Sequence, residues 1–228
     1  MTEALVALLQ YADGLFPAGG FAHSFGLETY VQDGTVTDRA GLEAFVVAHL
    51  EGSAGPADAV VVATAVQLAT AVDLVGWIAL DAKLEAMKTV PETRAASRQM
   101  GRQMLRVAVA TTGDPFVAEL GRAVAEARAA GHHAPVFGAT LGRAGATPVD
   151  AAAAYLYATA AVLIGAGLRL MALGQLEGQR VLTAVRPRIT RLAGAAATAS
   201  PDAMWSFNPG LELAGIRHAS LDARLFRS

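Results

Sequence analysis

A run of eighteen residues without a charged side chain, Ala151 to Leu168, most constrains how this chain can fold. The run is long enough to span a membrane, and Asp150 and Arg169 close it on both sides. Alanine and glycine fill more than half of it, so few side chains favour transfer into lipid. We therefore expect a helix buried in a large core or a subunit interface, where small side chains let helices approach closely. A helical membrane-associated protein is the alternative.

Helical periodicity extends through most of the remaining sequence. Apolar residues recur at helical intervals in residues 3–12, 24–32, 37–50, 58–70, 73–88, 91–112, 115–130, 136–142, 148–180 and 211–226. Breaks are expected at Gly52 to Pro56 and in residues 131–135, and residues 194–201 form a linker after a weak helix around Pro187. Neither a βαβ pattern nor a hairpin dipeptide is present. The sequence predicts an all-α fold without a sheet, a single-domain bundle of about ten helices over residues 1–228.

The composition excludes several classes of protein. A chain of 228 residues with 54% hydrophobic residues is long enough for one sizeable domain, or for two small domains that share a core. A formal net charge of −2 gives no overall attraction to nucleic acid. The absence of cysteine excludes disulfides and sulfur-ligated zinc and fits a reducing compartment. Because the first residues also lack the pattern of a signal peptide, we expect a cytoplasmic protein.

Residues 13–30 combine four glycines, one proline, three phenylalanines and a histidine. Large rings beside conformationally permissive glycines are typical of a binding loop. Within it, residues 22–26 resemble a nucleophile elbow, which raises a serine hydrolase using Ser24 as an alternative function. That motif needs a strand before the serine, and the sequence supplies none. We therefore expect Ser24 to cap a helix that runs to Gln32 and to turn Phe21 and His23 outward.

The histidines predict no tightly closed metal site. They are His23, His49, His132, His133 and His218, and their spacing provides no regular ligand pair. Surface or helix-capping roles are the simplest expectation, and His23 and His218 are the candidates for a weak or transient site across a subunit interface. The sequence also lacks a phosphate-binding glycine loop, so we expect no nucleotide on this chain.

One predicted helix carries a basic stripe. Arginine recurs at every fourth position, at Arg94, Arg98, Arg102 and Arg106. Like charges at this spacing repel one another, so carboxylates should lie nearby. Glu92, Glu119 and Glu126 are the internal candidates, and an acidic docking partner is the alternative.

The C-terminal end keeps apolar residues almost to its last position. Leu221, Leu225 and Phe226 recur at helical spacing where chain ends are usually polar and frayed. We therefore expect residues from about 202 to 228 to form a docking segment that binds either the body of the protein or a second protein.

Several of these motifs occur in the order found in one known family. They are Asp13 with residues 16–30, Glu92-Thr93-Arg94 with Ser97 and Gly101, Val136-Phe137-Gly138, Leu173-Gly174-Gln175 with Gly178-Gln179, and His218 with residues 220–221 and 224–228. Together they resemble the UreF family of urease accessory proteins over nearly the whole chain. Two positions depart from the family pattern: Ala219 replaces a frequent glutamate, and Gly14 replaces a common serine.

The resemblance implies a non-enzymatic, all-α homodimer. Such a protein binds UreD, called UreH in some bacteria, and recruits and regulates the GTPase UreG so that nickel is inserted into the urease apoprotein. GTP would be bound by UreG, nickel would pass transiently, and neither nucleic acid nor membrane would be a partner. The resemblance implies partner-binding roles for Phe16, Pro17, Gly19, Gly20, Phe21, His23, Ser24, Glu28, Tyr30, His218, Leu221, Arg224, Leu225 and Phe226. It also implies that Tyr155 and Tyr157 form the dimer interface.

Overall fold

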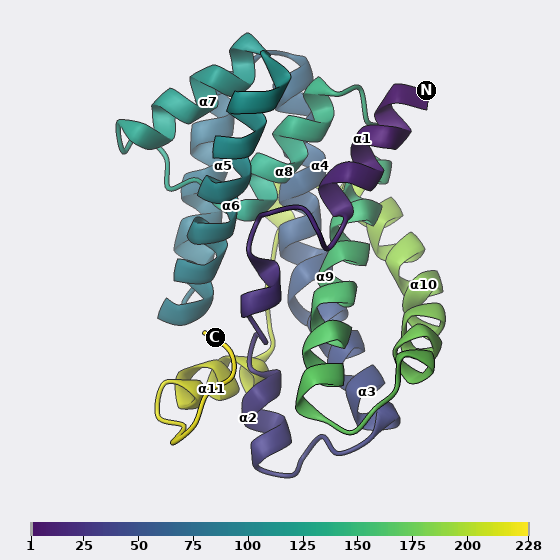
Figure 1. Ribbon diagram of the computed structural model, residues 1–228. Helices are drawn as coiled ribbons and strands as arrows, with labels where there is room; N and C mark the ends of the chain where they lie inside the picture. Colours follow the sequence, from purple (N-terminus) through teal and green to yellow (C-terminus); the bar gives the residue numbers. More distant parts are fainter. Residues whose placement is uncertain (1, 228) are drawn as a thin grey trace.

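The computed structural model describes residues 2–227, and all regular structure within them is helical (Figure 1). The α-helices are α1 (Thr2–Ala12), α2 (Leu27–Gln32), α3 (Arg39–His49), α4 (Val60–Thr70), α5 (Leu74–Met87), α6 (Pro91–Thr112), α7 (Pro115–Ala125), α8 (His133–Arg143), α9 (Pro148–Leu170), α10 (Gln175–Thr198) and α11 (Pro209–His218). Three further helices are the 3-10 helices η1 (Gly20–Ala22) and η3 (Pro201–Ala203) and the π-helix η2 (Leu50–Ala59). The predicted all-α fold without a sheet is confirmed for the described residues.

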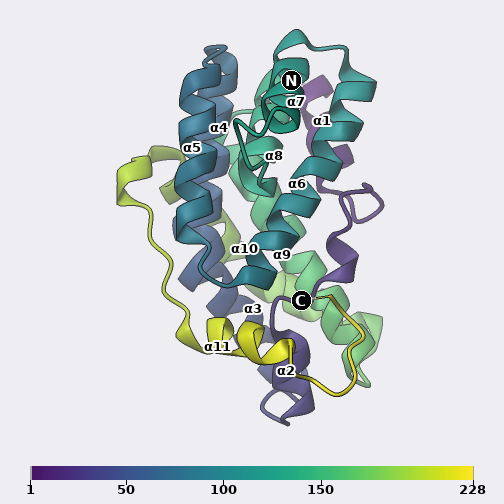
Figure 2. The ribbon, with the colours of Figure 1, turned by 90° about the vertical axis from the view of Figure 1, so that its left-hand side faces the viewer.

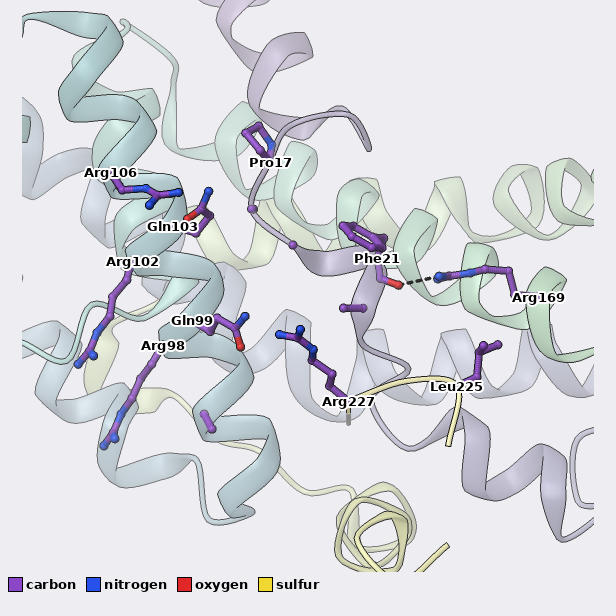
Figure 3. A pocket seen from close by; sticks show the side chains of 14 residues that line it. Pro17, Phe21, Arg98, Gln99, Arg102, Gln103, Arg106, Arg169, Leu225 and Arg227 are labelled. Atoms are coloured by element: carbon purple, nitrogen blue, oxygen red, sulfur yellow. Dashed lines mark hydrogen bonds between the residues drawn. The ribbon is translucent and has the colours of Figure 1, made fainter. Parts of the chain in front are cut away.

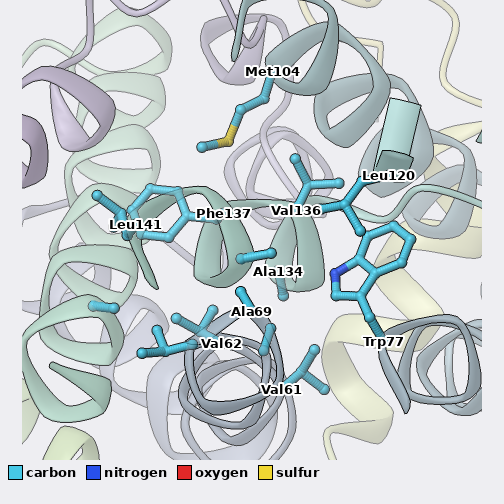
Figure 4. Close-up of a cluster of buried hydrophobic side chains, with 14 of the residues drawn as sticks. Val61, Val62, Ala69, Trp77, Met104, Leu120, Ala134, Val136, Phe137 and Leu141 are labelled. Atoms are coloured by element: carbon cyan, nitrogen blue, oxygen red, sulfur yellow. The ribbon is translucent and has the colours of Figure 1, made fainter. Parts of the chain in front are cut away.

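The first apolar cluster is built around the contact between α4 and α8 (Figure 4). The rings of Phe137 and Trp77 and the side chain of Met104 are fully buried there. The indole of Trp77 donates a hydrogen bond from Nε1 to the carbonyl of Pro135 (2.9 Å), so its one polar atom is satisfied inside the core. This cluster joins α5, α6 and α7 to the central pair α4 and α8.

Gly138 explains how α4 and α8 come so close. A Cβ atom at this position would overlap the carbonyl oxygen of Val62 and lie 2.9 Å from the Cβ of Ala65. One turn later, a Cβ at Gly142 would lie 2.9 Å from the Cα of Val66. The two backbones therefore touch through glycine, and the valines of α4 face the fully buried surface of α8.

The uncharged run forms most of α9, which packs against α10 and α4 and contributes to a second apolar cluster (Figure 1). Leu156 and Leu163 on one face are fully buried. In length and composition α9 would suffice to cross a membrane, and half of its most apolar window is buried inside the molecule. The buried half agrees with the expectation that this helix packs in the core.

The expected break between residues 52 and 56 is wrong. The backbone continues from α3 through the π-helix η2 into α4, although Pro56 lies inside η2. Proline has no N–H for the helical ladder, and a wider π turn accommodates it. The carbonyls of Gly52 and Pro56 accept hydrogen bonds from the backbone N–H groups of Phe207 (2.9 Å) and Trp205 (3.4 Å). Tertiary contacts thus stabilise a segment that local sequence marks as a loop.

The other helix boundaries were also misplaced in part. The helix expected over residues 148–180 ends at Leu170, and α10 begins only after Gly174. α10 then continues through Pro187 and Gly194, where a weak helix and a linker were expected. Its buried side chains, Val181, Val185, Ile189, Leu192, Ala193 and Ala196, pack on α3, η2 and α9. Apolar burial therefore overrides the helix-breaking tendency of its proline and glycine.

The C-terminal segment crosses the lower end of the molecule. α11 packs against α2 and α6, and the chain after it turns back toward η1 (Figure 2). The side chain of Thr29 in α2 donates to the carbonyl of Ala214 in α11 (3.0 Å). Residues from the two ends of the sequence are thereby brought together beside α6.

Candidate functional site

The loop before α2 presents Phe21 to solvent. Its side chain is 68% exposed, as predicted. Gly19 has a φ of +88°, a left-handed conformation that favours glycine, and it leads directly into η1. Gly20 is buried in close contact with Met100 and Val162. The turn is therefore anchored through Gly20 while the next side chain points outward.

His23 does not point outward as expected. It is 3% exposed, and burial together with the nearby charge of Arg227 lowers its pKa to about 4. Ser24 is fully buried, and its Oγ accepts a long hydrogen bond from the N–H of Glu28 (3.4 Å) at the start of α2. No strand precedes Ser24 in the described part of the chain, so the context of a nucleophile elbow is missing.

A buried histidine links three separate segments. His218, at the end of α11, is fully buried between the carboxylates of Glu28 and Glu92. Its Nε2 lies 2.9 Å from Glu28 Oε2, and its Nδ1 lies 3.1 Å from Glu92 Oε2. The departure at Ala219 therefore leaves His218 with carboxylate partners, supplied by α2 and α6.

Glu28 also holds the C-terminal tail, residues 219–227. The backbone N–H groups of Leu225 and Phe226 donate to its two carboxylate oxygens, at 2.6 and 3.1 Å. Burial by itself would raise the pKa of Glu28, but these donors and the ring of His218 bring the pKa below its ordinary value. An ionised carboxylate is thus the form that binds the tail.

The tail docks on the body of the same chain, one of the two outcomes expected. Phe226 is buried, and the guanidinium of Arg169 lies 4.4 Å from the centre of its ring. The N–H of Arg227 donates to the carbonyl of Ala22 (2.9 Å), while Leu225 stays 63% exposed. The helix expected to run to residue 226 ends at His218, and the N–H groups of Leu225, Phe226 and Arg227 bind Glu28 and Ala22 instead of continuing it.

The remaining residues of the expected contact surface lie around this cluster. Phe16 is half-buried against the ring of Tyr11, and Tyr30 is half-buried against the ring of Phe45. Leu221 is half-buried, Arg224 is exposed within 3.8 Å of a Glu92 oxygen, and Pro17 and Gly19 belong to the half-exposed loop. The sequence motifs at both ends of the chain thus form one continuous region.

This region borders an open groove of about 940 Å³ between α6, residues 17–22 and the tail (Figure 3). The charged residues of its lining are all arginines: Arg98, Arg102, Arg106, Arg169 and Arg227. Phe21 and Leu225 add exposed apolar side chains. The groove therefore joins the predicted contact loop, the basic stripe and the tail, a combination that sequence reasoning did not anticipate.

Among the described residues, only the first two arginines of the basic stripe, Arg94 and Arg98, are compensated, and the carboxylate that pairs with them is one that the sequence did not indicate. Glu85 of α5 pairs with Arg98 (Nε to Oε2, 2.8 Å) and more distantly with Arg94, and its pKa is lowered by the Arg98 guanidinium. The three carboxylates expected there bind elsewhere: Glu92 contacts His218 and Arg224, Glu119 pairs with Arg122, and Glu126 pairs with Arg128. Pairing across α5 and α6 depends on helix packing, which spacing along one helix does not reveal.

The two tyrosines expected at a dimer interface lie on different faces of α9. Tyr157 is 43% exposed and available to a partner. Tyr155 is 7% exposed, and its ring packs against those of His133 and Phe137 at centroid distances of 5.3 and 5.4 Å. Tyr155 is therefore a core residue of this chain, because two positions along a helix turn a side chain to the opposite side.

Sequence reasoning also missed a small chamber of about 80 Å³ next to Phe25, where several titratable side chains meet. His49, His133 and the ion pair of Asp58 with Lys88 (2.9 Å) line it. Burial lowers the pKa of both histidines to about 4, so they are neutral near pH 7. In residues 2–227 no group of three histidine, aspartate or glutamate side chains is arranged to hold a metal ion, and this includes the candidates His23 and His218.

Comparison with known proteins matches residues 36–186 of the chain to the UreF family. The protein named urease accessory protein UreF in Bacillus sp. (strain TB-90) is 30% identical, with 98% of this chain and 99% of that protein aligned. Its namesake in Arthrobacter sp. (strain FB24) is 33% identical, with 98% and 96% aligned. The one in Actinobacillus pleuropneumoniae is 33% identical, with 98% and 99% aligned.

Proposed function

Because the chain belongs to the UreF family of urease accessory proteins, we propose that it is a non-catalytic scaffold for urease maturation. In this role it forms a homodimer, binds UreD (UreH in some bacteria), and recruits and regulates the GTPase UreG on the urease apoprotein. GTP is held by UreG, and nickel is the cargo that the assembly inserts into urease. We place this assembly in the cytoplasm.

The exposure of Phe21 is the observation that carries this proposal. Phe21 is 68% exposed on a turn anchored by the buried Gly20. Covering this ring with a partner removes apolar surface from water and so contributes favourable free energy to binding. Its carbonyl oxygen accepts a hydrogen bond from Arg169 (2.7 Å), which keeps the turn in place. The ring is thus presented in advance to a partner, with little ordering left to do on binding.

The partner-binding surface needs no catalytic chemistry of its own. Ser24 is buried, and the described residues provide no strand for a nucleophile elbow. His23, Glu28 and His218 are also buried, so they support the surface from beneath. Among the expected partner-binding residues, Pro17, Phe21, Arg224 and Leu225 are exposed and available for direct contact.

Co-purification with UreD and UreG tests the proposal. Phe21→Ala should abolish retention of UreG on the tagged protein while the purified chain keeps its size by light scattering. Val75→Ala is the matched control, since Val75 is 79% exposed on α5, away from the groove. If Phe21→Ala retained UreG as well as Val75→Ala, the role of this loop would be wrong.

The homodimer is tested separately at Tyr157. Tyr157→Asp places a charge on the exposed face of α9 and should give a monomer by light scattering, with helix content unchanged by circular dichroism. A dimer that survives this substitution would exclude Tyr157 from the interface. Tyr155→Asp is not informative here, because Tyr155 lies in the core.

A further inference from the structure

The arginine groove contains positive charge that the described residues do not neutralise. Five arginines line it, and no aspartate or glutamate among residues 2–227 does. Arg98 is paired with Glu85, the Nε of Arg102 donates to the carbonyl of Ala130 (2.9 Å), and Arg169 is bound to Phe21 and Phe226. None of Arg102, Arg106, Arg169 and Arg227 forms an ion pair among the described residues, and Arg106 and Arg227 form no side-chain hydrogen bond there either.

Arg106 and Arg227, the two groove arginines with neither an ion pair nor a side-chain hydrogen bond among the described residues, stand on opposite sides of the groove. Figure 3 shows Arg227 reaching from the tail toward Gln99 of α6, with Gln103 and Arg106 further along the same helix. Guanidinium groups bind carboxylates through two parallel hydrogen bonds, and amide side chains add donors between them. The side of the groove formed by Arg106, Arg227 and the two glutamines is therefore suited to a ligand that carries more than one carboxylate.

The edge of the groove adds a second requirement. Phe21 and Leu225 are 68% and 63% exposed beside the arginines. A small inorganic anion would leave both apolar side chains in water, and a nucleic acid would need a wider basic surface than this chain of net charge −2 provides. A peptide can place a carboxylate and an apolar side chain within a few residues of each other.

We propose that this groove binds an acidic segment of a partner protein. Carboxylates of the segment pair with Arg106 and Arg227, and an apolar side chain of the segment packs against Phe21 and Leu225. The inference rests on the proposed function only in taking the occupant to be part of a protein, and it adds the chemistry that the groove recognises. Since Glu28 holds the N–H groups of Leu225 and Phe226, the docked tail supplies one wall of the groove.

Binding of a designed peptide tests the inference directly. The probe is a short fluorescein-labelled peptide in which glutamate alternates with leucine, followed by fluorescence anisotropy at low salt. We expect the wild-type protein to bind the peptide, with an affinity that falls as salt is added. Arg106→Glu or Arg227→Glu should each lower that affinity by about tenfold or more. Arg106→Gln, which removes the charge without reversing it, should weaken binding less. Failure of the wild-type protein to bind the peptide would overturn the inference.

Controls separate this site from general charge effects. Arg128→Glu alters an exposed arginine that pairs with Glu126 outside the groove, and it should leave peptide binding unchanged. An equal loss in Arg128→Glu would overturn the inference. The inference would also be overturned if inorganic phosphate displaced the peptide completely, or if a peptide of glutamate alone bound as tightly as the alternating peptide. The same holds if a single-stranded oligonucleotide bound with an affinity that depends equally on Arg106. Circular dichroism and urea unfolding of each variant establish that it is folded.

The same variants distinguish this inference from the proposed function. UreG and UreD co-purification is measured in parallel with peptide binding. Loss of peptide binding in Arg106→Glu with UreG and UreD both retained would show that neither protein uses the groove, and it would overturn the inference that the groove holds a segment of a partner protein in this assembly. Absence of peptide binding by a wild-type protein that retains UreG would overturn the groove and leave the scaffold role intact.

Discussion

The contact between α4 and α8 and the contact between the tail and α2 are stabilised in opposite ways. At the first, the backbones of Gly138 and Val62 touch, and the surrounding side chains are apolar. At the second, the carboxylate of Glu28 accepts hydrogen bonds from the tail, and His218 bridges Glu28 to Glu92. Close backbone packing tolerates no added atom, whereas a polar latch depends on a few groups and can open locally. The difference teaches that the rigid body and the partner-binding surface respond to different perturbations.

Adding one methyl group at Gly138 should have the largest effect on stability. In Gly138→Ala the new Cβ would overlap the carbonyl of Val62, so α4 and α8 must separate along their length. We expect a loss of about 3 kcal/mol or more in the free energy of unfolding, the upper range for overpacked cores. Urea unfolding followed by circular dichroism measures it.

Gly194→Ala is the matched control for this prediction. Gly194 lies in α10, where a Cβ would meet nothing within 4 Å. The same glycine-to-alanine change should therefore stabilise the protein, by up to about 1 kcal/mol, since alanine favours the helix. If both variants changed stability alike, close approach would not be what distinguishes the α4–α8 contact.

Removing the charge of Glu28 should open the latch without unfolding the body. Glu28→Gln keeps the shape of the side chain but loses charged hydrogen bonds to the N–H groups of Leu225 and Phe226. We expect tail docking to weaken by about 2 kcal/mol, in the range for charged hydrogen bonds. Hydrogen exchange at these two amides should speed up while α8 stays protected. Glu3→Gln, in the exposed part of α1, is the control, and unchanged exchange in Glu28→Gln would refute the latch.

Features set by local signals could be predicted from the sequence, and features set by tertiary packing could not. Three helix starts were found because their signals are local: Asp38 accepts a hydrogen bond from the N–H of Gly41 (2.8 Å), and Pro91 and Pro148 occupy first-turn positions. The exposure of Phe21 followed from its glycine-rich turn. Boundaries failed at Pro56 and in α10, where burial and tertiary hydrogen bonds outweigh local preference.

The candidate site was predictable only as separate motifs. Glu28 and His218 are 190 residues apart in sequence, and no local pattern indicates that they meet. The burial of His23 and the placement of Tyr155 in the core likewise depend on which face of a neighbouring element covers them. Periodicity predicts that a side chain lies on some face, and tertiary packing decides what that face touches.

Acidification should weaken the body through half-buried histidines whose pKa is lowered, such as His133. The pKa of His133 is lowered to about 4 by burial, while an exposed histidine titrates near 6.5. Between these values the unfolded chain takes up a proton that the folded chain does not, so stability falls as pH falls from 6.5 toward 4. One such histidine contributes about 1.4 kcal/mol per pH unit.

Replacing His133 isolates its share of that pH dependence. His133→Phe retains an aromatic ring against Phe137 and Tyr155 and removes the titrating group. Its free energy of unfolding between pH 6.5 and 4.5 should fall less steeply than that of the wild-type protein, by about 1.4 kcal/mol per pH unit. Equal slopes in the two proteins would mean that His133 is not held neutral by burial.

The smallest effect is expected where the loop and the tail meet, at Arg169. Its Nη1 donates to the carbonyl of Phe21 (2.7 Å), its Nε donates to Gly165 (3.1 Å), and its planar group stacks on Phe226. Arg169→Lys keeps the charge but loses the planar group that makes these contacts together. We expect a loss of about 0.5–1 kcal/mol in tail docking, the size of a partly exposed cation–π contact, with faster hydrogen exchange at Phe226 and Arg227. Because the body packs without Arg169, the free energy of global unfolding should be unaffected. If Arg169→Lys lowered global and local stability equally, the tail and the body would unfold as one cooperative unit.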